Sequence, residues 1–162
     1  MENLIKKGNS HPPCNTLIST IPFSVISRSP EDTFNFGLEI APLLKNGIII
    51  GLKGSLGSGK TCLIKGICRG LGIQEEITSP TYSIISEYEA LIPVYHIDAY
   101  RLDSEDDFYA LGGDEVIYGK GISLIEWADR LPSLSAGFDI IINIDIMEDD
   151  KRFISTQFRE MK

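Results

Sequence analysis

The fold is decided by the stretch Gly54-Ser55-Leu56-Gly57-Ser58-Gly59-Lys60-Thr61. It matches G-x-x-x-x-G-K-[ST], the pattern of a phosphate-binding loop (Walker A). The apolar, β-branched run before it, at residues 48–53, predicts a buried strand. After the loop, four apolar residues recur with the spacing of a helix: Leu63, Ile64, Ile67 and Leu71. The motif therefore has the strand–loop–helix context that separates a phosphate loop from a chance glycine-rich turn.

The residue types of this loop suit one chemical task, the binding of phosphate. Its glycines let the backbone turn tightly and point successive N–H groups inward. A helix that begins near Lys60 adds the positive end of its dipole. Lys60 can reach the β- and γ-phosphates of a nucleotide, and the Thr61 hydroxyl can ligate Mg²⁺. The sequence therefore predicts that residues 54–61 bind a nucleotide.

The composition predicts one compact domain, because the chain has 162 residues and is 43% hydrophobic. We expect residues 1–20 to form a loose N-terminal extension and residues 21–162 to form the domain. The net charge of −8 argues against a surface that grips nucleic acid or anionic lipid unaided. No run of 18 apolar residues and no signal peptide is present in the sequence, so we expect a cytoplasmic protein with no membrane association. Three cysteines, Cys14, Cys62 and Cys68, form no C-x-x-C pair and are expected to be buried free thiols.

Strand patterns surround the loop on both sides. We expect further strands at 22–27, 84–89, 93–98, 121–126, 138–146 and 151–158. The three-residue link at 90–92 forces two of them to pair antiparallel, because a parallel return needs a long crossover. The predicted fold is therefore α/β of the phosphate-loop NTPase class, a single mixed sheet flanked by helices.

Helix-start signals occur at three further places. Ser29 precedes Pro30 and two acids, which predicts a helix that runs to Asn46-Gly47. Its apolar face is expected to comprise Phe34, Leu38, Ile40, Ala41 and Leu44. Ser104 is expected to cap a helix that reaches Leu111, and Asp114 to cap a shorter one.

Nucleotide hydrolysis also needs a metal ligand and a group that orients water. Glu126 ends the apolar strand at 121–126, and this is where the Walker B acid lies in such folds; the alternative is a surface acid at a strand end. Asp98 ends another strand and could orient water, although by itself it is as easily explained as a satisfied polar strand end. Arg101 could offset phosphate charge, and His96 is better explained as a packed histidine than as a catalyst.

Five sequence blocks in this order resemble the TsaE (YjeE) family of small bacterial ATPases of the tRNA threonylcarbamoyladenosine pathway. The blocks are Gly54–Thr61, Thr78–Tyr82, His96–Leu102, Leu111-Gly112 and Leu124–Arg130, and the resemblance covers roughly residues 22–158. Five ordered blocks are far more specific than the phosphate loop alone.

The resemblance implies binding of ATP and Mg²⁺ and association with the TsaB–TsaD pair. It implies that TsaD performs the transfer to tRNA and that this chain meets tRNA only through its partners. Lys60, Asp98 and Glu126 would be catalytic, and Thr61 and Glu126 would hold the metal. Two switch-like segments are implied, one comprising Ser79, Pro80 and Thr81, and the other containing Trp127. Cys62 would also line the nucleotide site, at a position where many members have a second threonine.

Rival functions remain open on the sequence alone. A GTPase is disfavoured, because neither an N-K-x-D motif nor a D-x-x-G motif follows the loop. A small-molecule kinase would need arginines gathered in a lid, whereas the six arginines are scattered along the chain. A nucleotide-dependent binding module without useful hydrolysis is the third possibility, since many switch ATPases need a partner to complete their site.

Overall fold

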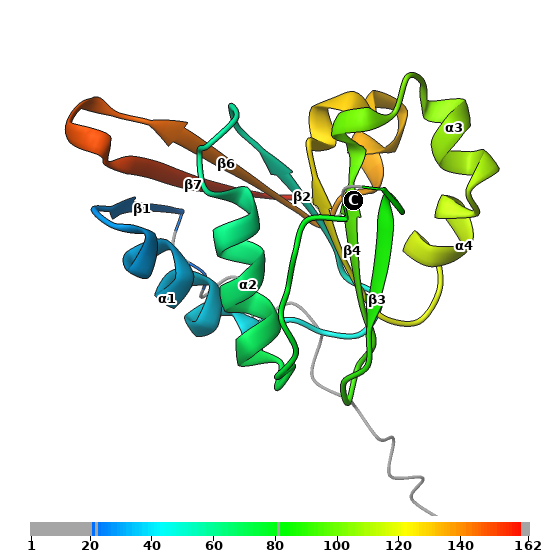
Figure 1. Ribbon diagram of the computed structural model, residues 1–162, viewed down its shortest axis with the longest axis horizontal. Coiled ribbons are helices and arrows are strands. Elements are labelled where there is room, and N and C mark those ends of the chain that lie inside the picture. The colour runs from blue at the N-terminus through cyan, green and yellow to red at the C-terminus, as the bar shows by residue number, and fades with distance from the viewer. Residues whose placement is uncertain (1–20, 22, 81, 160–162) are drawn as a thin grey trace, which may run out of the picture.

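A computed structural model of the chain describes residue 21, residues 23–80 and residues 82–159. The predicted extension at 1–20, together with Cys14, Pro22 and Thr81, lies outside the described residues. Within these residues, seven strands form a mixed sheet in the order β1-β7-β6-β2-β5-β4-β3 (Figure 1). The predicted fold class is confirmed, since helices cover both faces of this single sheet.

The middle of the sheet is parallel. Strand β2 (Ile49–Lys53), which leads into the phosphate loop, lies between β5 (Ile122–Glu126) and β6 (Ile140–Ile146). Strand β4 (Val94–Asp98) pairs parallel with the far side of β5. The carboxyl ends of these strands meet at one edge of the sheet, where open α/β folds place their ligands.

Both margins of the sheet are antiparallel. Strand β3 (Ile85–Tyr88) pairs with β4, as the short link at 90–92 predicts. On the other side β7 (Arg152–Phe158) pairs with β6, and β1 (Ser24–Ser27) forms the outermost strand on β7. The strand positions predicted from the sequence are thus confirmed, and every end agrees to within two residues.

Two hydrophobic cores lie on opposite faces of the sheet, because side chains alternate along each strand. Helices α1 (Pro30–Ile40) and α2 (Lys60–Gly70) pack with Ile50 and Leu52 on one face. Helices α3 (Glu105–Ala110) and α4 (Gly113–Ile117) pack with Ile49 on the other. Five short 3₁₀ segments connect the described elements: Ala41–Leu43, Ala99–Arg101, Ala128–Arg130, Pro132–Gly137 and Glu148–Asp150.

Helices α1 and α2 approach each other through glycine. A Cβ atom added to Gly66 would lie 2.0 Å from the carbonyl oxygen of Phe34, and one added to Gly37 would lie 2.4 Å from that of Leu63. The two backbones are therefore in direct contact. This contact fixes α2, and with it the end of the phosphate loop, against α1.

The helix caps are partly as predicted. Ser29 caps α1 and accepts a hydrogen bond from the Asp32 amide, and Ser104 caps α3 in a capping box. The prediction for Asp114 is wrong: Gly112 occupies the N-cap of α4 in a left-handed conformation, and Asp114 lies in the first turn.

The predicted extent and face of α1 are also wrong in part. The α-helix ends at Ile40 and tightens into a 3₁₀ turn, because Pro42 has no N–H to continue the ladder. Phe36 is buried in place of Leu38, which is 39% exposed. The close contact at Gly37 turns this face of the helix toward α2.

Cys68 is buried as expected, whereas Cys62 is only partly buried.

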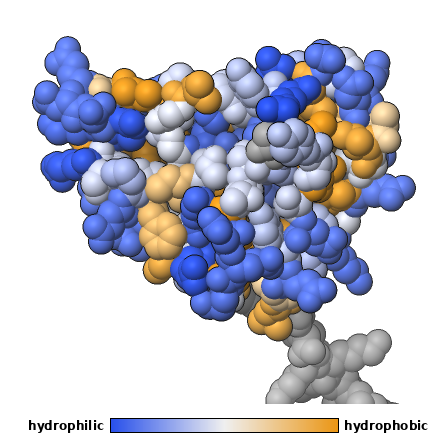
Figure 2. All heavy atoms as spheres, viewed as in Figure 1, coloured by the Kyte–Doolittle hydropathy of each residue, from blue (hydrophilic) through white to orange (hydrophobic). Residues whose placement is uncertain are grey.

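The surface on the side shown in Figure 2 is mostly hydrophilic. Hydrophobic residues show over the β6–β7 hairpin, where the exposed fractions of Ile146 and Met147 are 47% and 40%. Among the described residues, no helix has the length and apolar character needed to span a membrane.

Candidate functional site

The phosphate loop joins β2 to α2 at the carboxyl edge of the sheet. Gly54, Gly57 and Gly59 have φ values of 150°, 74° and 110°. This left-handed backbone favours glycine, which explains the residue types of the motif. Leu56 is 78% exposed at the tip of the loop, whereas Ser58 is fully buried beneath it.

Lys60 begins α2 and turns its side chain back over the loop. Its Nζ atom donates hydrogen bonds to the carbonyl oxygens of Gly54 and Ser55, at 2.8 and 2.9 Å. Burial lowers the pKa of Lys60 below the ordinary value of 10.5, and the negative charges of Glu126, Asp98 and Asp129 act in the opposite direction.

The indole ring of Trp127 covers the Lys60 ammonium group. The distance from Nζ to the ring centroid is 3.8 Å, which is a cation–π contact. Trp127 follows β5 in a left-handed conformation with φ of 58°, an unusual backbone for a non-glycine residue. Its ring also packs on Tyr100, at 4.8 Å between centroids. The predicted second switch residue thus lies directly against the lysine of the loop.

Glu126, the predicted metal acid, joins the loop to the neighbouring strands. Its Oε1 atom accepts a hydrogen bond from the Thr61 hydroxyl at 2.8 Å. The same oxygen lies 2.9 Å from Nε2 of His96, and both side chains are buried. A carboxylate oxygen can only accept, so Nε2 of His96 donates this hydrogen bond. Its Nδ1 atom then has no hydrogen-bond partner among the described residues.

Asp98 lies beside Glu126, because the two residues are register partners on β4 and β5. Its Oδ2 atom accepts a hydrogen bond of 2.5 Å from the Ser79 hydroxyl, and Oδ1 accepts one from the Tyr100 amide. Ser79 and the buried Pro80 belong to the predicted first switch segment, and Thr81 lies outside the described residues. The structure thus brings this segment to the same edge of the sheet as the loop.

Two further predicted residues lie at the margin of this cluster. The Cys62 thiol donates a hydrogen bond to the carbonyl oxygen of Pro30. Burial raises the pKa of Cys62, so the thiol form is favoured. Arg101 stacks on the ring of Tyr82, with its Cζ atom 5.6 Å from the ring centroid, and Tyr82 is 93% exposed.

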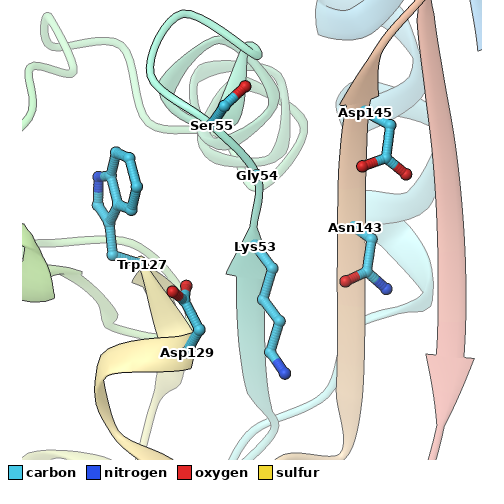
Figure 3. A pocket seen from close by; sticks show the side chains of 7 residues that line it. All are labelled: Lys53, Gly54, Ser55, Trp127, Asp129, Asn143 and Asp145. Atoms are coloured by element: carbon cyan, nitrogen blue, oxygen red, sulfur yellow. The ribbon is translucent and has the colours of Figure 1, made fainter.

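A cavity of about 370 Å³ opens beside the start of the loop (Figure 3). Its lining residues are Lys53, Gly54, Ser55, Trp127, Asp129, Asn143 and Asp145. Sequence reasoning missed Asn143 and Asp145. Their signal is the alternation of polar residues with buried isoleucines in the second half of β6, which places both on the face opposite α2.

The oxygen ligands at this edge of the sheet fit a hard metal ion that takes its remaining ligands from a bound nucleotide and from water. Among the described residues, no three His, Cys, Asp or Glu side chains gather as an all-protein metal site. Mg²⁺ takes one or two protein oxygen ligands and completes its shell with phosphates and water. The Thr61 hydroxyl and the Glu126 carboxylate are two such oxygens in direct contact.

The sheet order and the loop between β2 and α2 define a phosphate-loop NTPase fold. Residues 27–154 match the family model described as "Threonylcarbamoyl adenosine biosynthesis protein TsaE". The chain therefore belongs to the TsaE family, and the resemblance seen in the sequence is confirmed.

Individual relatives agree with this assignment. The tRNA threonylcarbamoyladenosine biosynthesis protein TsaE of Treponema pallidum is 42% identical over 130 residues, covering 80% of this chain and 96% of the relative. The TsaE protein of Bacillus subtilis is 38% identical over 128 residues, covering 78% and 80%. The crystal structure of Bacillus subtilis YdiB superposes with a TM-score of 0.71 at 32% identity and covers 85% of each chain.

Proposed function

We propose that this chain is a cytoplasmic ATPase that binds and hydrolyses Mg-ATP in support of the TsaB–TsaD machinery for tRNA modification. The observation that carries the proposal is the hydrogen bond from Thr61 to Glu126. It joins the end of a phosphate loop to a buried carboxylate on the adjacent strand, which is the pair of groups that a nucleotide-bound Mg²⁺ requires.

The residues divide the work of hydrolysis between them. Loop amides and Lys60 bind the phosphates, and Thr61 and Glu126 hold the metal. When bound, Mg²⁺ would offset the negative charge of the phosphates. His96 orients the Glu126 carboxylate, since it contacts the same oxygen as Thr61. Asp98, held by Ser79, lies next to Glu126 and orients water for attack.

The switch contacts support a role for partners in turnover. Lys60 is tied to two loop carbonyls and covered by Trp127. Phosphate binding requires the ammonium group to exchange these contacts for phosphate oxygens, so Trp127 and the phosphates compete for it. A partner that moves Trp127 would complete the site. The acidic net charge of −8 supports tRNA contact through partners only.

The first test is ATP affinity, measured by calorimetric titration of the full chain in the presence of Mg²⁺. Lys60→Ala is expected to weaken ATP binding by about a hundredfold, because it removes a charge-assisted contact to phosphate. The thermal unfolding midpoint is expected to change little, since the glycines set the loop backbone. Lys65→Ala, an exposed site on the same helix, is the matched control and should bind ATP like the wild type. Unchanged ATP affinity in Lys60→Ala would rule out the phosphate-loop assignment.

A further inference from the structure

Arg152, the first residue of β7, contacts the phosphate loop across 94 and 95 residues of sequence. Its Nε atom donates a hydrogen bond to the carbonyl oxygen of Ser58 at 3.1 Å. Its Nη2 atom donates to the carbonyl oxygen of Gly57 at 3.3 Å. The guanidinium group therefore binds two consecutive peptides in the middle of the loop.

The same guanidinium group also holds the turn from which it comes. Nη1 donates to the carbonyl oxygens of Asp150 and Lys151, at 2.5 and 3.2 Å. Asp149 and Asp150 both have left-handed backbone, with φ of 59° and 57°, so this is a strained turn. The ion pairs found among the described residues, His96–Glu126 and Lys151–Asp149, do not include Arg152. Its charge is thus directed at peptide carbonyls.

These contacts set the direction of a loop amide. A trans peptide is planar, so its C=O and the following N–H point in opposite directions. With the Ser58 carbonyl held by Arg152, the Gly59 N–H points in the opposite direction, away from Arg152. Ser58 N–H is used within the loop, where it donates to the Ser55 carbonyl at 3.2 Å. A charged donor on the Ser58 carbonyl also polarises the peptide and strengthens the Gly59 N–H as a donor.

The neighbouring strand supports the other end of the loop. A Cβ atom at Gly54 would lie 2.5 Å from the carbonyl oxygen of Ile144 on β6 and 2.6 Å from Oγ of Ser58. Ser58 itself is fully buried. The β6–β7 hairpin therefore contacts the loop at its start, through β6, and at its middle, through Arg152.

We infer that Arg152 is a positioning residue of the phosphate loop, which aims the Gly59 amide at the phosphate that ATP and ADP share. The inference rests on the proposed function and adds a residue that no sequence motif marks. A positioning residue affects the binding of ATP and ADP equally. A group that acts on the transferred phosphate would affect ATP alone, so the two roles can be told apart.

The test uses the full chain with Arg152→Ala, Arg152→Lys and, as the matched control, Arg159→Gln just beyond the other end of β7. Dissociation constants for Mg-ATP and Mg-ADP, and kcat at saturating ATP with the partner pair, are measured for each. Arg152→Ala is expected to weaken the binding of both nucleotides by about tenfold and to leave kcat unchanged. This is the pattern expected when an interaction made equally in the ground state and the transition state is lost. Arg152→Lys should have an intermediate affinity, because an ammonium group keeps the positive charge but lacks the fixed fork of donors with which Arg152 holds the Gly57 and Ser58 carbonyls. Millimolar methylguanidinium should restore affinity to Arg152→Ala, and Arg159→Gln should match the wild type.

Three results with the variants would overturn the inference alone. Wild-type affinity in Arg152→Ala would show that the contact does not shape the loop. Loss confined to ATP, together with lower kcat, would place Arg152 at the γ-phosphate instead. Failure of methylguanidinium and of Arg152→Lys to restore any affinity would indicate a purely structural defect. A wild-type chain that binds neither nucleotide would overturn the proposed function and this inference together. If the wild-type chain binds nucleotide and Lys60→Ala does not, the proposed function stands, and the Arg152 variants then test this inference alone.

Discussion

At the scale of single residues, the site depends on one oxygen atom. Oε1 of Glu126 accepts hydrogen bonds from Thr61 and from His96, at 2.8 and 2.9 Å. The histidine holds the carboxylate in place while the hydroxyl links it to the loop. Because Glu126 is only 3% exposed, its charge is screened little by water, and a divalent cation at this point would interact with it strongly.

Glu126→Gln is expected to lower Mg²⁺-dependent ATP turnover by about a hundredfold, because the amide keeps both hydrogen bonds as an acceptor but loses the negative charge. ATP affinity measured without metal should stay within about twofold of wild type. Turnover assays across a Mg²⁺ series, paired with titrations in EDTA, make the comparison. Equal loss of metal-free binding and of turnover would show that Glu126 is structural.

Sequence reasoning identified the residues of this cluster but not all of their contacts. The loop motif and the strand ends pointed to Lys60, Glu126 and Asp98. The contact between Ser79 and Asp98 joins residues 19 apart, and no local pattern encodes such a meeting. His96 was correctly predicted to be packed, yet its contact with Glu126 depends on β4 and β5 being neighbours. The catalytic and metal-binding roles of these residues stay predictions.

At the scale of elements, the phosphate loop is held between two supports. Helix α2 is pressed onto α1 through Gly37 and Gly66, and the β6–β7 hairpin contacts the loop from the other side. The helix contact explains why the predicted face of α1 was wrong: amphipathic spacing does not reveal that a glycine, rather than an apolar side chain, meets the partner helix. No sequence pattern marks Arg152, because its contact with the loop is formed by the tertiary fold.

Gly66→Ala is expected to destabilise the chain by about 2 kcal/mol or more, because its Cβ atom would overlap the Phe34 carbonyl and force the helices apart. Urea unfolding followed by circular dichroism measures the change. ATP affinity should fall as well, since α2 begins at the loop. Gly137→Ala is the control, because its Cβ atom would lie 3.8 Å from the Tyr118 hydroxyl, an ordinary van der Waals contact. Equal unfolding midpoints for the two variants would contradict the helix contact.

At the scale of the whole molecule, the chain is a mixed sheet that gathers a phosphate loop and the residues Ser79 and Trp127 at one edge. The fold class could be predicted, because one motif with its flanking strand and helix specifies it. The family assignment rests on five ordered blocks and is confirmed by the match over residues 27–154. The division into an extension at 1–20 and a domain stays a prediction.

The most direct test of the account is ATP hydrolysis by the purified full chain, alone and with its cognate TsaB–TsaD pair. We predict slow hydrolysis alone and clear stimulation by the pair, with both lost in Glu126→Gln. Transfer of phosphate to a metabolite would favour the kinase alternative, and ATP binding without turnover beside the partners would favour a binding module. Hydrolysis that is indifferent to the pair, with no complex formed, would contradict the proposed function.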